Sequence, residues 1–205
     1  MEYRSVGDRC AVDLPSLKLS VSDEQALSIL IDKGFKMIKV DPLALARGCI
    51  GKSRYQRGAD PSLAPTVVDC SSLTKWLYGQ LGVWLPRRSI QQRTMGRAIQ
   101  LDKIAAGDLV LVSGWIDYYV NDPDDGVGHV GVATGTRTVI HAANKKAGII
   151  ETPLERFIGK SGFRGARRII PKTRPILTLE PPKHRCVETS DDIKWIILQN
   201  LPKRI

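Results

Sequence analysis

The chain contains 205 residues, of which 42% are hydrophobic and 25% are charged, and its net charge at pH 7 is +10. This composition is ordinary for a folded protein with its own core, and it excludes a largely disordered chain. The length favours one main domain with extensions. No stretch is apolar for long enough to span a membrane, so we expect no transmembrane segment.

Helix signals dominate the first part of the chain. A helix is predicted over about 22–33, and Gly34 follows it. A second helix is predicted to begin at Pro42, with Asp41 as its cap, and to stop near the glycines that follow. Residues 52–66 are rich in Gly, Pro and Ser, which predicts a loop.

A cysteine stands where the next helix begins. The apolar residues of "VVDCSSLTKWLYGQLG" have helical spacing from about Cys70 to Leu81, and Gly82 occupies the position that favours a left-handed cap. Unpaired backbone N–H groups and the positive end of the helix dipole favour a thiolate at Cys70, which would make it nucleophilic. Asp69 opposes this second negative charge unless it points away or a partner neutralises it.

The second half of the chain has strand signals. Apolar runs predict strands in "AAGDLVLVSGW", "HVGVATGTRTVIHAA", "GIIETP" and "RGARRII". An acidic loop over 115–127 separates the first two, and its Trp115, Tyr118 and Tyr119 either wall a cleft or cover the edge of the core. Helices that precede an antiparallel sheet indicate an α+β fold.

The last part of the chain is basic and rich in proline. Residues 171–188 are predicted to be extended, and a short amphipathic helix follows, with one face formed by Ile193, Ile196, Ile197 and Leu201. From residue 160 onward, eleven Lys and Arg stand against four Asp and Glu, which favours peripheral contact with an anionic surface. Because the region has only two Phe, Tyr or Trp residues, Phe163 and Trp195, and no nucleic-acid motif, we expect no nucleic-acid partner.

These signals divide the chain into three parts. We expect an N-terminal extension with one helix over 1–40, a main domain over 41–170, and a C-terminal extension over 171–205 that ends in the amphipathic helix. The cysteines are irregularly spaced, without a Cys-x-x-Cys pair, and the chain has only three histidines. This pattern predicts neither a zinc site nor a disulfide framework, and we expect no metal and no cofactor.

Two of the histidines are candidates for a base that would activate the thiol. His184 lies in the basic extension and is most simply exposed to solvent, whereas His129 and His141 lie on two predicted strands. A three-residue loop over 135–137 would pair Gly131 with His141, which places His129 diagonally opposite His141, about 7–8 Å away at the backbone. The two imidazoles would then meet on one face, where Gly131 and Ala133 leave room for the helix that carries Cys70.

In this order, the motifs resemble the NlpC-type cell-wall peptidases of the papain-like superfamily. The resemblance covers about residues 41–158. "VVDCSSLTKWLYGQLGVWLPRRSIQQ" resembles the family's Asp-Cys-Ser-Gly helix with its Leu-Pro-Arg and Gln segment, and "AAGDLVLV" resembles its Pro-Gly-Asp-Leu strand. "GHVGVATG" and "VIHAA" resemble the strands that carry the remaining catalytic residues. The chain departs from the pattern at Ser72, where Gly is usual, and at Arg54, where Pro is usual.

The resemblance implies a papain-like fold, with N-terminal helices packed on a central antiparallel sheet, and a role for each matching residue. Cys70 would be the nucleophile, His129 the general base and acid, and His141 the residue that orients His129. Tyr55 would lie near the substrate. Asp69 and Ser71 resemble the residues that hold the free amine of a short stem peptide in some members.

The implied function is a cysteine peptidase that hydrolyses amide bonds in the stem peptides of bacterial peptidoglycan, with the bond after γ-linked D-glutamate favoured. One alternative is an amidase or acyltransferase that uses the same Cys-His-His triad on lipids or other amides. The other is a non-catalytic module that binds the cell wall. Because the N-terminus lacks the apolar stretch of a Sec signal, we expect a cytoplasmic enzyme, or one exported by a signal-independent route such as phage lysis or an effector secretion system.

Overall fold

The computed structural model describes residues 2–114, 126–173 and 176–201. The chain divides into two compact units. Unit 1 comprises Met1–Val40, Tyr78–Trp84 and Pro171–Ile205, and unit 2 comprises Asp41–Leu77 and Leu85–Ile170. The two terminal segments that the sequence suggests as separate extensions therefore belong to one unit. Trp115, Tyr118 and Tyr119, expected to wall a cleft or cover the core, lie outside the described residues.

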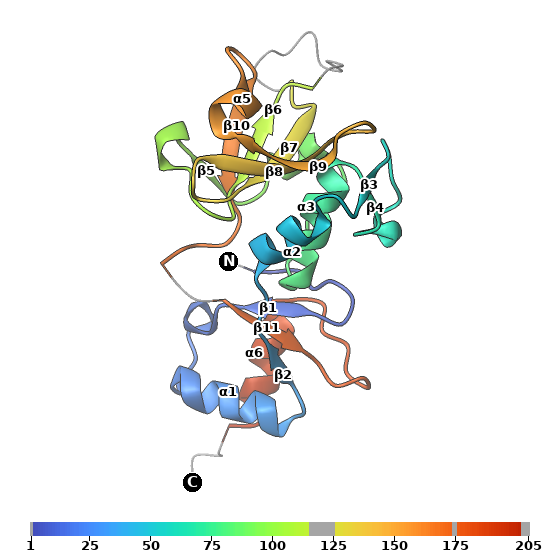
Figure 1. Cartoon of the computed structure of the whole chain (residues 1–205). Coiled ribbons are helices and arrows are strands. Elements are labelled where there is room, and N and C mark those ends of the chain that lie inside the picture. The colour runs from blue at the N-terminus through green and yellow to red at the C-terminus, as the bar shows by residue number, and fades with distance from the viewer. Residues whose placement is uncertain (1, 115–125, 174–175, 202–205) are drawn as a thin grey trace. The chain divides into compact units, whose positions relative to one another are not determined.

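Unit 2 is built on a six-stranded sheet with the strand order β5-β10-β6-β7-β8-β9, in which all neighbours are antiparallel (Figure 1). The strands are β5 (Arg97–Ile99), β6 (Leu109–Val112), β7 (His129–Ala133), β8 (Thr138–Asn144), β9 (Gly148–Pro153) and β10 (Phe163–Arg168). The four apolar runs of the sequence correspond to β6, to β7 with β8, to β9 and to β10, so these predictions are confirmed.

Helices cover both faces of this sheet. On one face, Leu73 and Leu77 of α3 (Cys70–Gln80) pack with Val132, Ile140 and Ala142. On the other face, α5 (Leu154–Ile158) packs with β6, β7 and β8 through a cluster formed by Val110, Ala133, Val139, Leu154 and Phe157. Because successive side chains of a strand point to opposite faces, both faces of β7 and β8 are buried.

The remaining elements of unit 2 precede or follow α3. They are α2 (Pro42–Cys49), the parallel pair β3 (Arg54–Tyr55) and β4 (Val67–Val68), the 3-10 turns η2 (Pro61–Leu63) and η3 (Leu101–Lys103), and α4 (Ser89–Gln92). Asp41 caps α2 by accepting hydrogen bonds from the N–H groups of Leu43 and Ala44, as the sequence predicts. The predicted loop over 52–66 contains β3, because Arg54 and Gln56 donate their N–H groups to Thr66 and Val68.

Unit 1 is a small α+β unit of its own. Its sheet has the order β1-β11-β2, with β1 (Cys10–Val12), β11 (Leu177–Glu180) and β2 (Lys36–Ile38), and η1 (Leu14–Leu17) follows β1. Two helices, α1 (Asp23–Asp32) and α6 (Ser190–Gln199), contact each other and share its apolar core. In this way, residues from both ends of the chain complete one sheet.

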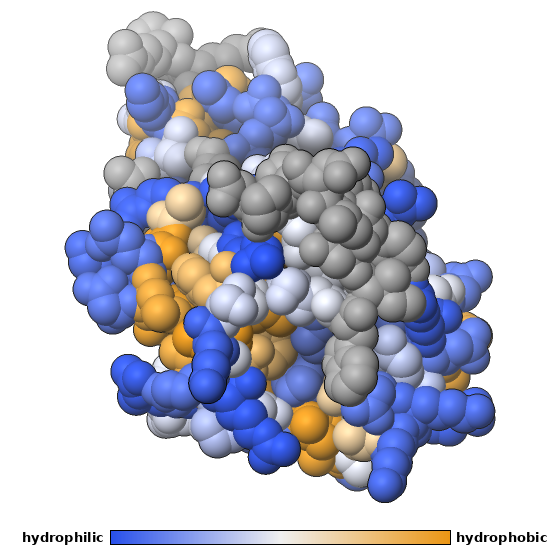
Figure 2. All heavy atoms as spheres, turned by 90° about the horizontal axis from the view of Figure 1, so that it is seen from above, coloured by the Kyte–Doolittle hydropathy of each residue, from blue (hydrophilic) through white to orange (hydrophobic). Residues whose placement is uncertain are grey.

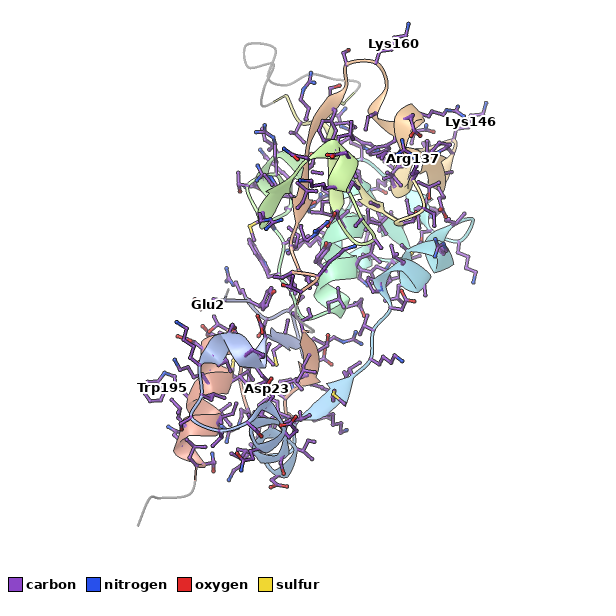
Figure 3. All side chains as sticks on the ribbon, turned by 90° about the vertical axis from the view of Figure 1, so that its left-hand side faces the viewer. Glu2, Asp23, Arg137, Lys146, Lys160 and Trp195 are labelled. Carbon is purple, nitrogen blue, oxygen red and sulfur yellow. The ribbon has the colours of Figure 1, made fainter. Side chains whose placement is uncertain are left out.

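Both helices of unit 1 match their predicted positions. Ser22 caps α1, and Ile193, Ile196 and Ile197 of α6 are buried. Trp195 lies on the other side of α6, with 61% of its surface exposed, and points away from the unit (Figure 3). The apolar stripe of α6 is therefore a core face, as its spacing predicts.

On the face that Figure 2 shows, hydrophilic side chains surround apolar patches. The turns of unit 2 carry basic side chains that point outward, among them Arg137 between β7 and β8, Lys146 between β8 and β9, and Lys160 after α5 (Figure 3). Among the described residues, no helix is both long enough and apolar enough to cross a membrane.

Candidate active site

The N-terminus of α3 is fixed by a reciprocal cap. Asp69 accepts the N–H of Ser72 at 2.8 Å through Oδ1, and the Ser72 hydroxyl accepts the N–H of Asp69 at 2.8 Å. Ser72 is fully buried. Such a pair satisfies two backbone donors of the first turn at once, so the serine that replaces the usual glycine has a structural role. Cys70 follows Asp69 as the first residue of the helix.

Arg87 neutralises Asp69. Its Nη2 donates to Asp69 Oδ2 at 2.5 Å, and its Nη1 donates to Asp69 Oδ1 at 3.0 Å and to the Ser71 hydroxyl at 2.9 Å. Asp69 also accepts the N–H of Gly58 at 3.0 Å, and only 7% of its surface is exposed. A buried carboxylate is stable when it is paired in this way, so Asp69 has a charged partner, which is one of the two possibilities that the sequence left open.

Gln92, on α4, stabilises the start of α3 through hydrogen bonds. Its amide nitrogen donates to the carbonyl groups of Ser71 and Pro86, both at 3.0 Å, and its amide oxygen accepts the Thr74 hydroxyl at 2.7 Å. The side chain is fully buried and uses both ends of its carboxamide. The Leu-Pro-Arg and Gln segment of the sequence thus supplies two residues, Arg87 and Gln92, that hold the nucleophile's turn in place.

The protonation state of Cys70 differs from the one that the sequence predicts. The backbone N–H groups of Val130 and Ser71 and the charge of Arg87 favour the thiolate, but burial and the Asp69 charge outweigh them and raise the pKa of Cys70 to about 11. The helix start therefore does not produce a thiolate at neutral pH, because the loss of solvation dominates. The thiol needs a base to remove its proton when it reacts.

His129 and His141 meet as the strand register predicts. Val132 pairs with Ile140 and Ala133 with Val139, which confirms the three-residue loop and puts Gly131 opposite His141. His129 Nε2 lies 2.9 Å from His141 Nδ1, and the two rings are nearly perpendicular, at 83°. The diagonal arrangement derived from the sequence is confirmed.

Both imidazoles are held in the neutral form by their surroundings. Burial lowers the pKa of His129 to about 4, although the Asp69 charge opposes the shift. Burial, with a smaller contribution from His129, lowers the pKa of His141 to about 3. Phe157 of α5 contacts both rings, with centroid distances of 5.6 Å to His129 and 4.7 Å to His141. At neutral pH, each ring therefore carries a single proton.

Gly131 lacks room for a side chain, but not for the reason that the sequence predicts. α3 packs on the opposite face of β7, against Val132, and so Gly131 does not make room for that helix. A Cβ atom on Gly131 would instead lie 2.4 Å from Val139 Cγ1 and 3.0 Å from His141 Cβ. Glycine is required there because β8 places its own side chains against that position.

The structure assembles the sequence-predicted residues in unit 2. Tyr55 feels the electrostatics of the same site: burial, and then the charges of Cys70 and Asp69, raise the pKa of its phenol. Sequence reasoning assigned no role to Arg87, Gln92, Phe157 or Thr152, whose hydroxyl lies 3.0 Å from His141 Nε2. The first two lie in a recognised motif, but no sequence pattern marks the last two. Among the described residues, no group of three or more His, Cys, Asp and Glu side chains could hold a metal ion.

Comparison with known proteins assigns the family. Residues 52–168, more than half of the chain, match the model of the NlpC/P60 family. The chain belongs to the NlpC/P60 family. It is 37% identical over 110 residues to a probable endopeptidase of Corynebacterium glutamicum, a match that covers 54% of this chain and 46% of the relative. It is 32% identical over 115 residues to the gamma-DL-glutamyl hydrolase of Bacillus subtilis, covering 54% and 26% of the two chains.

Solved structures share the fold. A family protein from Bacillus cereus superposes with a TM-score of 0.54 at 23% identity, over 64% of this chain and 40% of that one. The peptidoglycan hydrolase RipB from Mycobacterium tuberculosis superposes with a TM-score of 0.50 at 19% identity, over 74% and 69%. The α+β fold expected from the resemblance is therefore confirmed. The chain spans less than half the length of either curated relative described above.

Proposed function

We propose that this NlpC/P60 protein is a cysteine peptidase that hydrolyses amide bonds in the stem peptides of bacterial peptidoglycan. The observation that carries the proposal is the His129–His141 pair, with its 2.9 Å contact, in which His129 stands next to Val130, whose N–H donates a hydrogen bond to the Cys70 thiol. A nucleophile, a base and a residue that orients the base are the three parts of such a catalyst.

The first chemical step follows from the neutral state of the pair. His129 Nε2 is engaged by His141, which leaves Nδ1 as the nitrogen that takes the proton of Cys70. As the proton moves, the sulfur attacks the amide carbonyl and an oxyanion forms. The N–H of Cys70, which has no partner within the helix because it belongs to the first turn, stabilises this oxyanion.

The second step regenerates the enzyme. Protonated His129 gives its proton to the leaving amine as the C–N bond breaks, which leaves an acyl group on Cys70. His129 then takes a proton from water, and the hydroxide attacks the acyl group. The carboxylic acid product departs, and the proton returns to the sulfur.

The substrate's amine end would bind beside the helix start. We assign this role to Tyr55, Asp69 and Ser71. Because Arg87 already pairs with Asp69, the pair has little net charge, and an incoming ammonium group would be held mainly by donating hydrogen bonds to the Asp69 and Ser71 oxygens. The name of the Bacillus subtilis relative supports the γ-D-glutamyl bond as the favoured scissile bond. The basic segment over 171–205 would attract the anionic wall.

The test is mass spectrometry of purified muropeptides incubated with the wild type and with Cys70→Ala. The wild type is expected to release a defined stem-peptide fragment, and Cys70→Ala is expected to release none while keeping its fold by circular dichroism. Cleavage by neither protein, together with sedimentation of the wild type on sacculi, would replace the peptidase with a wall-binding module. Lipid-dependent acyl transfer without muropeptide release would favour the acyltransferase.

A further inference from the structure

A buried hydroxyl lies at the far end of the histidine pair. Thr152 Oγ1 is 3.0 Å from His141 Nε2, and His141 Nδ1 is in turn 2.9 Å from His129 Nε2. Both Thr152 and His141 are buried, with 9% and 8% of their surfaces exposed. The hydroxyl contacts the second imidazole on the side away from His129, so it can act on the nucleophile's base only through His141.

Three neighbouring strands create this line of polar groups. The residue directly opposite His141 is Gly131 on β7 and Ile150 on β9, and the contacting residues, His129 and Thr152, stand two positions away on each strand. The three side chains share the sheet face that α5 covers. The strand register therefore sets the order hydroxyl, imidazole, imidazole. A slip of one residue in either strand pair would put these side chains on different faces of the sheet.

The hydrogen-bond chain has two possible directions. If the Thr152 hydroxyl donates to His141 Nε2, the single proton of His141 lies on Nδ1 and is donated to His129 Nε2. The proton of His129 then occupies Nδ1, the nitrogen that must accept the proton of Cys70. If Thr152 accepts, His141 carries its proton on Nε2, His129 carries its proton on Nε2, and His129 Nδ1 has a free lone pair.

Only the second direction supports catalysis, and a hydroxyl can provide it. Threonine has two acceptor lone pairs, and its hydroxyl proton can rotate toward another acceptor. Because Thr152 and His141 are both buried, solvent has little access to take the place of the Thr152 oxygen. A change that removes this oxygen would leave the Nε2–H of His141 without a partner in a buried place, which is unfavourable.

We propose that Thr152 is a positioning residue that accepts the Nε2–H of His141 and so fixes His129 as the tautomer with a free Nδ1. The proposal rests on the proposed function, because only a general base needs that nitrogen to be free. Thr152 does not touch the substrate. Its effect is to select which of two tautomers the base occupies before the substrate binds.

The direct test is nuclear magnetic resonance of the full chain with ¹⁵N-labelled histidine at pH 7, because protonated and unprotonated ring nitrogens have well-separated shifts. The chain has only three histidines, and His184→Gln identifies the signals of the exposed one. The wild type is expected to show His129 and His141 protonated at Nε2. Thr152→Val is expected to move part of both populations to the Nδ1–H form, whereas Thr152→Ser is expected to keep the wild-type pattern.

Kinetics on muropeptides give the second readout. Thr152→Val is expected to lower kcat by about 10–100-fold with little change in KM, less than the roughly 10⁴-fold loss seen when a carboxylate that sets the tautomer is removed. Thr152→Ser should restore most of the activity. Thr134→Val is the matched control, because it removes a hydroxyl directly after β7 that is also buried, with 6% exposed, and bonds within the β7–β8 turn.

The results separate the two proposals. Wild-type His129 protonated at Nδ1, or a Thr152→Val variant with wild-type tautomers and wild-type kcat, would overturn the role of Thr152. A wild type that cleaves no muropeptide would overturn the proposed function. The tautomer measurement does not depend on activity, so it would still show whether Thr152 sets the direction of the chain.

Discussion

Replacing Arg87 with methionine would measure how much the ion pair with Asp69, the residue before Cys70, contributes to stability. Arg87 donates two hydrogen bonds to the Asp69 carboxylate, and a hydrogen bond to a charged group contributes about 1.5–3 kcal/mol. After the change, Asp69 keeps the N–H groups of Gly58 and Ser72 and the Ser71 hydroxyl. Its side chain is 9% exposed, whereas that of Arg87 is 31% exposed, so part of the interaction is already screened.

The expected loss of unfolding free energy is about 2–4 kcal/mol, somewhat below the loss for a fully buried pair. The assay is urea denaturation at pH 7. Arg88→Met is the matched control, because it removes the same group from the next residue, which is exposed, and it should cost less than about 0.5 kcal/mol. The double variant Arg87→Met with Asp69→Asn should recover part of the loss, since no unpaired buried charge remains.

A loss in Arg87→Met that is no larger than the loss in Arg88→Met would refute this reasoning. It would mean that the three remaining donors and the solvent satisfy Asp69 without the guanidinium. A double variant less stable than Arg87→Met alone would also count against it, because removing the Asp69 charge would then recover none of the loss.

Two further predictions concern the histidine pair. Gly131→Ala places a methyl group 2.4 Å from Val139 Cγ1, which should lower the free energy of unfolding by about 1–3 kcal/mol. The control is Gly48→Ala in α2, where a methyl group meets no neighbour within 4 Å and should be neutral or stabilising. Equal shifts of the melting temperature in the two variants would contradict the clash. Because the pKa of His129 is lowered to about 4 and that of His141 to about 3, the unfolded chain binds protons below about pH 6.5 that the folded chain does not, and stability falls as the pH drops from 6.5 through 4. Denaturation midpoints measured across that window should change more steeply with pH in the wild type than in His141→Gln, and parallel curves would rule out the buried neutral pair.

The histidine contact shows how far sequence reasoning reaches. Side chains alternate along a strand, so the length of the loop over 135–137 was enough to put His129 and His141 on one face. The helix that begins at Cys70 was likewise predicted from local signals, namely the apolar spacing and the glycine at 82. Where a prediction depended on one strand pair or one helix, the structure agrees with it.

The disagreements arise where several elements meet. The pKa of Cys70 is raised by burial and by the Asp69 charge, and the N–H groups of Val130 and Ser71 do not offset them. Gly131 is required by the side chains of β8 rather than by α3. The roles of Thr152 and Phe157 could not be predicted, because they depend on the register of β9 and on where α5 packs.

Local periodicity and the geometry of one hairpin were enough to predict the helices that begin near Asp23, Pro42 and Cys70, the four apolar strand segments of unit 2, and the pairing of the two histidines. The union of the two terminal segments in one unit, the ion pair between Arg87 and Asp69, and the hydroxyl from a third strand that ends the hydrogen-bond chain all depend on tertiary packing. These contacts join residues that are far apart in the sequence or on separate strands. Burial and partners of this kind are properties of the packed chain, and no local pattern records them.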